Sequence, residues 1–269
     1  MEISITGQVA AITGAGGVLC SHMALELAKQ GARVAVLDLD ARKAEQVAAE
    51  INASGRSAIA IPCDVMERGS VESACKKTLD TFGRVDILIN GAGGNKPAAT
   101  TNPEQSFFDL PAEALKWVFD LNLLGTILPC QVFGKSMSRT KRGSIVNISS
   151  MAAFLPLTHT VAYSAAKAGI SNFTKWLAVH MSREYTPEIR VNAIAPGFLL
   201  TEQNRFLLQN TDGTPTARGE SVLLKTPMNR YGAPEELAGA VVFLCSPAAS
   251  FITGVVLPID GGFSAFAGV

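Results

Sequence analysis

Short runs of apolar residues, rich in Val and Ile, alternate along the chain with longer segments whose apolar residues recur at helical spacing. Most of the short runs are apolar on both faces, a pattern typical of parallel strands that helices cover on each side. The strands predicted in this way are residues 9–13, 33–39, 58–63, 85–90, 144–149, 190–195 and 255–259.

Helical patterns fill the intervals between these runs, at residues 18–30, 41–54, 71–82, 112–138, 161–184 and 234–245. Asp40 and Ser70 stand where N-caps belong, and Pro234 suits the first turn of the last helix. The repeated alternation predicts an α/β fold with a Rossmann-like doubly wound parallel sheet, about seven strands with helices on both faces. Because no internal repeat or Pro/Ser-rich linker interrupts the pattern, we expect residues 1–269 to form a single domain.

Residues 197–232 depart from this alternation, since they contain no strand pattern and are dominated by polar residues, Gly and Pro. A connection of this length in a compact domain is usually functional or mobile. It follows the carboxyl end of a predicted strand, where open α/β sheets bind ligands. We therefore predict that residues 197–232 form a lid over the substrate.

Composition excludes several classes of protein. The 269 residues carry 23 Lys+Arg and 23 Asp+Glu, so no net charge would attract nucleic acid or an anionic membrane. The first residues lack the features of a signal peptide, and no uninterrupted apolar run reaches the length of a membrane span, so we expect a cytoplasmic protein. The five cysteines are odd in number and widely spaced, which fits neither a disulfide framework nor a metal site.

A glycine-rich turn joins the first predicted strand to the first helix and contains Gly14, Gly16 and Gly17. Such a turn lets the backbone approach a pyrophosphate at the N-terminus of a helix, although a plain tight turn would also explain the glycines. Asp38 ends the second strand about 20 residues later, where a carboxylate can bind an adenosine ribose and repel a 2′-phosphate. The two features together predict NAD as cofactor in preference to NADP.

Tyr163 and Lys167 stand four residues apart in a helical window, so their side chains share one face. A nearby ammonium stabilises a phenolate, and we expect Lys167 to lower the tyrosine pKa from its reference near ~10. Ser150 follows the fifth predicted strand, where its hydroxyl could bind a substrate oxygen. The three residues are suited to acid–base chemistry on an alcohol or carbonyl.

These motifs resemble the short-chain dehydrogenase/reductase family over essentially the whole chain, from Thr13 to the segment 260–262. The resemblance implies that Ser150 polarises the carbonyl, Tyr163 is the general acid/base, and Lys167 lowers the tyrosine pKa and holds the nicotinamide ribose. It also implies that Asn122 supports a proton-relay water. The cofactor-binding residues expected from motif and resemblance are Gly14, Gly16, Gly17, Val18, Leu19, Asp38, Asp64, Val65, Asn90, Ala92, Gly93, Tyr163, Lys167, Pro196, Gly197, Phe198 and Thr201.

The chain departs from the family pattern in two places. Val18 and Cys20 occupy the last two glycine positions of the usual Thr-Gly-x-x-x-Gly-x-Gly turn, and Gly91 replaces an asparagine of the usual Asn-Asn-Ala-Gly. These departures occur together with the segments 119–126 and 195–205, and the combination is similar to a bacterial subgroup described as D-mannonate oxidoreductases, or fructuronate reductases.

A sugar-acid substrate needs a cationic or amide partner for its carboxylate and hydrogen-bonding groups for its hydroxyls. The candidate substrate residues are Asn95, Met151, His159, Asn204 and Arg205, although His159 could be an ordinary loop histidine and Arg205 could lie on a solvated face. We therefore expect NAD(H)-dependent interconversion of D-fructuronate and D-mannonate. The alternatives are another polyol or sugar-acid dehydrogenase, such as a gluconate 5-dehydrogenase, and outside this class a non-catalytic NAD-binding sensor. The resemblance also implies a homotetramer with residues 112–138 and 161–184 in one interface.

Overall fold

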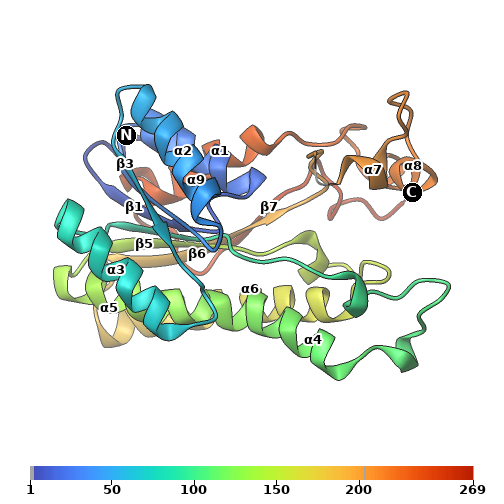
Figure 1. The fold of residues 1–269 in the computed structure, drawn as a ribbon, viewed down its shortest axis with the longest axis horizontal. Coiled ribbons are helices and arrows are strands. Elements are labelled where there is room, and N and C mark those ends of the chain that lie inside the picture. Colours follow the sequence, from blue (N-terminus) through green and yellow to red (C-terminus); the bar gives the residue numbers. More distant parts are fainter. Residues whose placement is uncertain (1–2, 203, 269) are drawn as a thin grey trace.

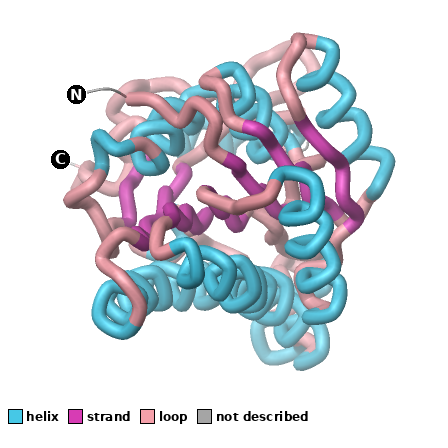
Figure 2. Tube along the Cα trace, turned by 90° about the vertical axis from the view of Figure 1, so that its left-hand side faces the viewer, coloured by secondary structure: helices cyan, strands magenta, loops and turns pink. Residues whose placement is uncertain are grey.

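The computed structural model describes residues 3–202 and 204–268, which form one seven-stranded parallel sheet between two layers of helices (Figures 1 and 2). The strand order is β3-β2-β1-β4-β5-β6-β7, and every neighbouring pair is parallel. The strands are β1 (Val9–Thr13), β2 (Arg33–Asp38), β3 (Ala58–Pro62), β4 (Ile87–Asn90), β5 (Gly143–Ile148), β6 (Ile189–Pro196) and β7 (Val256–Ile259). All seven predicted strands are confirmed, with small differences at their ends.

The strands lack polar alternation because both faces of the sheet are buried. All described side chains of β1, β4 and β6 are buried. Alternate residues of β1 contribute to different hydrophobic clusters, with Ala10 and Ile12 on one face and Val9 and Ala11 on the other. The first cluster packs under α1 (Val18–Lys29), α2 (Ala41–Ala53) and α9 (Ala238–Cys245), and the second under α3 (Arg68–Phe82), α5 (Gly125–Thr140) and α6 (Val161–Glu184).

One of the two predicted helix caps is confirmed. The Asp40 carboxylate accepts hydrogen bonds from the backbone amides of Arg42 and Lys43 at the start of α2. The prediction that Ser70 caps α3 is wrong, because α3 begins at Arg68. The Ser70 hydroxyl instead accepts a hydrogen bond of 2.9 Å from the Asp64 amide and fastens the turn after β3. Pro234 opens a 3₁₀ turn, Pro234–Leu237, that leads into α9.

The helix predicted at residues 112–138 consists of α4 (Ala112–Phe119), a π-helical turn (Asp120–Leu124) and α5. By length and composition alone, the continuous run Ala112–Thr140 would pass as a membrane span, with a mean hydropathy of 1.2. The core helix of a soluble protein passes the same test, and α5 contributes Cys130, Phe133 and Met137 to the second cluster. The apolar composition of this run is thus used in packing against the sheet.

The segment 197–232 forms no strand within its described residues, as predicted, but it contains two short helices that the sequence pattern did not indicate. These are α7 (Arg205–Leu208) and α8 (Ala217–Lys225), which stand together beyond the carboxyl ends of the strands (Figure 1). The segment between β4 and α4 projects from the same end of the molecule and lies below α7 and α8 in the view of Figure 1. The molecule therefore has two arms at one end, residues 197–232 and residues 94–111.

Candidate active site

A cavity of about 760 Å³ lies along the carboxyl ends of β1 to β6, and residues of the arm 197–232 form part of its lining. Most of the residues predicted to bind cofactor or substrate line it. These are Gly14, Gly17, Val18, Leu19, Asp38, Asp64, Val65, Ala92, Gly93, Ser150, Tyr163, Pro196, Gly197, Phe198, Thr201 and Asn204. The residues predicted from the sequence pattern therefore form much of the lining of one cavity.

The glycine turn after β1 brings the backbone close to the turn after β4. Gly14 has φ +65°, and a Cβ there would lie 2.8 Å from the backbone of Ala92. Gly17 precedes the first residue of α1 in an extended conformation, and both Gly17 and Val18 line the cavity. The free amides at the N-terminus of α1 therefore belong to the cavity wall. Helix N-termini of this kind attract anionic groups.

Asp38 ties the glycine turn to the end of β2. One carboxylate oxygen accepts the Gly16 amide at 2.8 Å, and the other accepts the Asp40 amide at 2.9 Å. A carboxylate offers about four acceptor positions, so two remain for a ligand. Gly16 itself does not line the cavity, because its amide is turned toward Asp38 and a Cβ there would meet Lys43. Lys43, which sequence reasoning missed, also lines this end.

The turn after β4 is built around Gly91, whose amide donates to the Thr13 hydroxyl at 3.1 Å. A Cβ at Gly91 would collide with the Cys20 sulfur, so the two departures from the family pattern occupy one space. Asn90 is buried behind this wall, where its amide nitrogen donates to Asn147 at 2.8 Å. Asn90 therefore braces β4 against β5 and does not line the cavity.

Ser150 and Tyr163 both line the cavity wall where β5 ends and α6 begins, and the Ser150 hydroxyl is close enough to Tyr163 to influence its pKa. Lys167 lies one turn further along α6, is almost fully buried, and donates from Nζ to the Ile148 carbonyl at 2.8 Å. Its Nζ is 5.6 Å from the centre of the Tyr163 ring. The predicted Ser–Tyr–Lys cluster is thus assembled, with Lys167 behind the wall.

The expected lowering of the Tyr163 pKa is not found. Burial raises the pKa of Tyr163 above its ordinary value, and the hydrogen bond with Ser150 only partly opposes this. Burial also lowers the pKa of Lys167 to about 8, since a charged ammonium is poorly solvated there, while the nearby Cys20 thiol acts in the opposite direction. Proximity to lysine indicated a lower tyrosine pKa, but desolvation of both side chains outweighs it.

Asn122 lies in the π-helical turn and is fully buried. Its amide nitrogen donates to the carbonyls of Gly94 at 2.7 Å and Val118 at 2.8 Å, and its amide oxygen accepts from the Gly94 amide at 3.2 Å. A Cβ at Gly93 would lie 2.7 Å from that oxygen and 3.4 Å from Lys167 Nζ. Asn122 therefore holds the Gly93–Gly94 backbone beside Lys167, with both of its side-chain N–H donors already used.

The predicted substrate residues are mostly engaged elsewhere. Met151 is buried behind the wall, and the Asn204 amide nitrogen donates to the Leu199 carbonyl at 2.7 Å. His159 has φ +73° and shares a 3.0 Å hydrogen bond with the Thr101 hydroxyl. The last two predicted residues, Asn95 and Arg205, are exposed and also bond their neighbours. Asn95 donates to Thr100, and Arg205 donates to Glu202 and Gln209. Of the five, only Asn204 lines the cavity.

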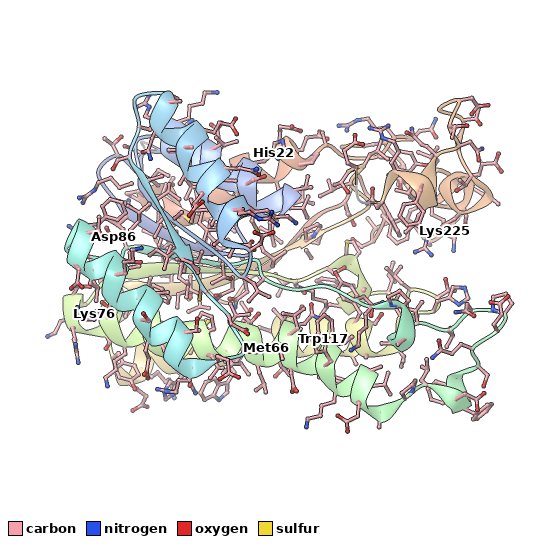
Figure 3. All side chains as sticks on the ribbon, in the orientation of Figure 1. His22, Met66, Lys76, Asp86, Trp117 and Lys225 are labelled. Carbon is pink, nitrogen blue, oxygen red and sulfur yellow. The ribbon has the colours of Figure 1, made fainter. Side chains whose placement is uncertain are left out.

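Several cavity residues were missed by sequence reasoning, including Cys20, Leu39, Lys43, Met66, Trp117, Leu121 and Leu199. Most of them are apolar, and core packing explains such residues equally well in a sequence. Trp117 is the largest, and it reaches the cavity from α4 (Figure 3). Its signal was its position five residues before Asn122 in the same predicted helix.

Comparison with known proteins bears on the whole chain. A family model described as enoyl-(acyl carrier protein) reductase matches residues 14–264. The uncharacterized oxidoreductase UxuB of Bacillus subtilis is 48% identical over 275 residues, covering 99% of this chain and 98% of that protein.

Two solved structures are similar throughout. A protein designated a candidate D-mannonate oxidoreductase from Haemophilus influenza, solved with bound NAD, has a TM-score of 0.93 at 49% identity, covering 99% of this chain and 98% of that one. A gluconate 5-dehydrogenase from Burkholderia cenocepacia, in complex with NADP and tartrate, has a TM-score of 0.88 at 28% identity, with 98% of each chain covered. The likeness therefore extends from the glycine turn to the last strand.

Proposed function

The chain belongs to the short-chain dehydrogenase/reductase family, and on that premise we propose that it uses NAD(H) to interconvert the keto sugar acid D-fructuronate and the hydroxy sugar acid D-mannonate. It is an oxidoreductase of the kind that acts on CH–OH groups. The observation that carries the proposal is that Ser150 and Tyr163 line one cavity together with the Asp38 carboxylate. The likeness to the D-mannonate oxidoreductase candidate supports the choice of substrate.

The residues present fit a dinucleotide. Gly14 lets the turn after β1 pack against Ala92 in the turn after β4, both of which line the cavity, and the N-terminus of α1 suits the negative charge of a pyrophosphate. Asp38 keeps free acceptor positions for ribose hydroxyls, and its charge opposes a 2′-phosphate. Lys43 at the same end would attract such a phosphate, but Asp38 is anchored by two amides, so we propose NAD over NADP.

When bound, NAD(H) would supply or accept the hydride at the substrate carbon. In the direction of reduction, the Tyr163 hydroxyl gives its proton to the carbonyl oxygen, and the Ser150 hydroxyl donates a hydrogen bond to that oxygen as it becomes negative. Lys167 keeps two N–H donors beyond its bond to Ile148, and its ammonium stabilises the Tyr163 phenolate left behind. Asn122 positions the Gly93–Gly94 backbone next to Lys167, and we propose that the proton that restores Tyr163 reaches it from solvent past the Lys167 ammonium at this edge.

The arm 197–232 has the role of a lid in this proposal. Its base reaches the cavity through Phe198, Leu199 and Thr201, while α7 and α8 lie further out. Exposed apolar side chains such as Phe206 and Leu224 are available to cover a bound substrate. An arm built this way can exclude water from the reacting carbon.

We also propose a cytoplasmic homotetramer. The exposed side chains of Trp176, Val179 and Tyr185 lie on α6 or directly after it, and Trp176 and Tyr185 line a second cavity of about 700 Å³ between residues of α5 and α6. Apolar residues gathered in this way favour contact with another copy of the chain. The five cysteines are buried free thiols, which fits a reducing compartment.

The proposal is tested by following NADH absorbance with purified protein and a panel of sugar acids and uncharged polyols. We expect the protein to reduce D-fructuronate with NADH, and more slowly with NADPH. It should oxidise D-gluconate and D-mannitol very little. Turnover confined to another sugar acid would replace the substrate, and turnover confined to polyols would overturn the sugar-acid proposal. NADH binding without turnover on any of them would favour the sensor.

A further inference from the structure

Lys96 stands at the start of the arm 94–111 and places its ammonium over an aromatic ring. Its Nζ lies 4.5 Å from the centre of the Trp117 ring, a distance at which a cation is attracted to an indole face. Trp117 lines the cavity, whereas Lys96 is not part of its wall. The ammonium therefore contacts a side chain of the cavity wall.

Trp117 also connects Lys96 to the reacting end of the cavity. Trp117 and Tyr163 pack against one small hydrophobic cluster, formed by Ala99, Ala114, Val118 and Ala162. This cluster joins the arm, α4 and the start of α6. The indole and the Tyr163 ring thus belong to the same part of the wall, and Lys96 lies on that side of the opening.

Lys96 has no acidic partner. Among residues 3–202 and 204–268, Lys96 makes no ion pair, and Arg218 and Lys225 of the other arm make none either, while Arg205 pairs with Glu202 and Arg230 with Glu236. Lys96 differs from Arg218 and Lys225 in lying over Trp117, a side chain of the cavity wall. The backbone of Lys96 is fixed, since its carbonyl accepts the Ala99 amide at 3.0 Å and the Thr100 hydroxyl at 3.1 Å. A half-buried cation with a fixed backbone keeps its capacity to bind an anion.

We propose that Lys96, held over Trp117, binds the carboxylate of the substrate and makes the enzyme selective for sugar acids over uncharged sugars. The inference rests on the proposed function. It assigns substrate selection to Lys96, which is not among the substrate residues predicted from the sequence. The substrate carbonyl lies at Ser150 and Tyr163, the carbon chain runs along the Trp117 face, and the carboxylate meets the Lys96 ammonium. A charge-assisted hydrogen bond at that point discriminates by charge, which hydroxyl contacts alone do not.

The test compares D-fructuronate with D-fructose, which carries a keto group and hydroxyls but no carboxylate. Lys96→Met keeps the aliphatic length over Trp117 and removes the charge, and Lys96→Arg keeps the charge. Lys116→Met is the matched control, because Lys116 is an exposed lysine next to Trp117 in sequence, and the substitution causes the same loss of charge. KM, kcat and the NADH dissociation constant are measured for each variant.

We expect Lys96→Met to raise KM for D-fructuronate about 10- to 100-fold, with little change in kcat, in activity on D-fructose or in NADH binding. Lys96→Arg should recover most of the affinity, and Lys116→Met should behave like the unaltered protein. An unchanged KM in Lys96→Met, with D-fructuronate still turned over, would overturn the inference and leave the proposed function intact. Loss of NADH binding in both Lys96→Met and Lys96→Gln would show a structural lysine and also overturn it. Turnover of uncharged sugars alone by the unaltered protein would overturn both.

Discussion

The two ends of the cavity are built differently. At the nucleotide end, backbone amides of adjacent strand-to-helix turns are fastened to the side chains of Asp38 and Thr13 at the ends of β2 and β1. At the substrate end, two arms project beyond the sheet and leave large apolar side chains in solvent, with Phe108 92% and Leu224 79% exposed. One end is set by the sheet, and the other by loops and short helices.

This difference separates two kinds of specificity. In the proposed function the sheet edge supports the reaction, because it holds the cofactor cradle and the Ser150–Tyr163–Lys167 cluster on rigid elements. We propose that the arms select the substrate, since loops can change in length and sequence without disturbing the sheet. Substitutions at the sheet edge should therefore abolish activity, and those on the arms should redistribute it among substrates.

The largest effect is expected from Tyr163→Phe at the sheet edge. Removing the acidic hydroxyl should lower kcat for D-fructuronate reduction by roughly 10²- to 10⁴-fold, because proton transfer to the substrate oxygen is lost. The ring and its packing remain, so NADH should bind as before in a fluorescence titration. Full activity in this variant would remove Tyr163 from the mechanism.

Gly91→Ala tests how tightly the nucleotide end is packed. The added Cβ meets the Cys20 sulfur, and we expect a loss of about 1–3 kcal/mol in the free energy of unfolding, with weaker NADH binding. In a Cys20→Ala background the sulfur is gone, so the same substitution should cost clearly less. Urea unfolding of the four proteins gives the coupling, and additive losses would contradict a shared space.

The pH dependence of reduction tests the buried lysine. Because burial lowers the pKa of Lys167 to about 8, its ammonium is lost as the pH rises through that value, while Tyr163, with a raised pKa, stays protonated. We expect kcat/KM for D-fructuronate reduction to fall roughly tenfold between pH 7 and 9. Lys167→Arg keeps its charge throughout this range, so any activity it retains should not show this decline. A flat profile for the unaltered protein would contradict the account.

The smallest effect is expected on the lid arm, from Arg205→Met. Its guanidinium bonds Glu202 and Gln209 at the surface, and such exposed pairs contribute little. KM for D-fructuronate should change by less than about threefold. An increase in KM of tenfold or more would instead support the sequence-based prediction that Arg205 binds substrate, and it would weaken the case for Lys96.

The sequence pattern predicted the sheet well because burial on both faces leaves a clear mark. The seven apolar runs became seven strands, and the glycine turn, Asp38, Ser150, Tyr163 and Lys167 lie where motif spacing indicated. These features depend on neighbours within one turn or one strand-to-helix unit. A pattern of local spacing is sufficient to detect them.

Features that depend on distant neighbours could not be predicted in the same way. The helices α7 and α8 lie in a polar segment without strong periodicity, and Lys96 meets Trp117 across 20 intervening residues. The Tyr163 pKa depends on how completely the fold encloses the side chain, which residue spacing does not reveal. Asn95, His159 and Arg205 have the chemistry expected of sugar-binding residues, yet each bonds a nearby residue instead.

The central claim is that this cavity transfers hydride between NAD(H) and a sugar acid, and labelled cofactor tests it most directly. Stereospecifically deuterated [4-²H]NADH, in both the 4R and 4S forms, is incubated with D-fructuronate, and the product is examined by NMR. The account predicts D-mannonate with deuterium on the carbon that carried the keto group, from one of the two cofactor forms only. Product without deuterium from either form, or no product at all, would contradict it.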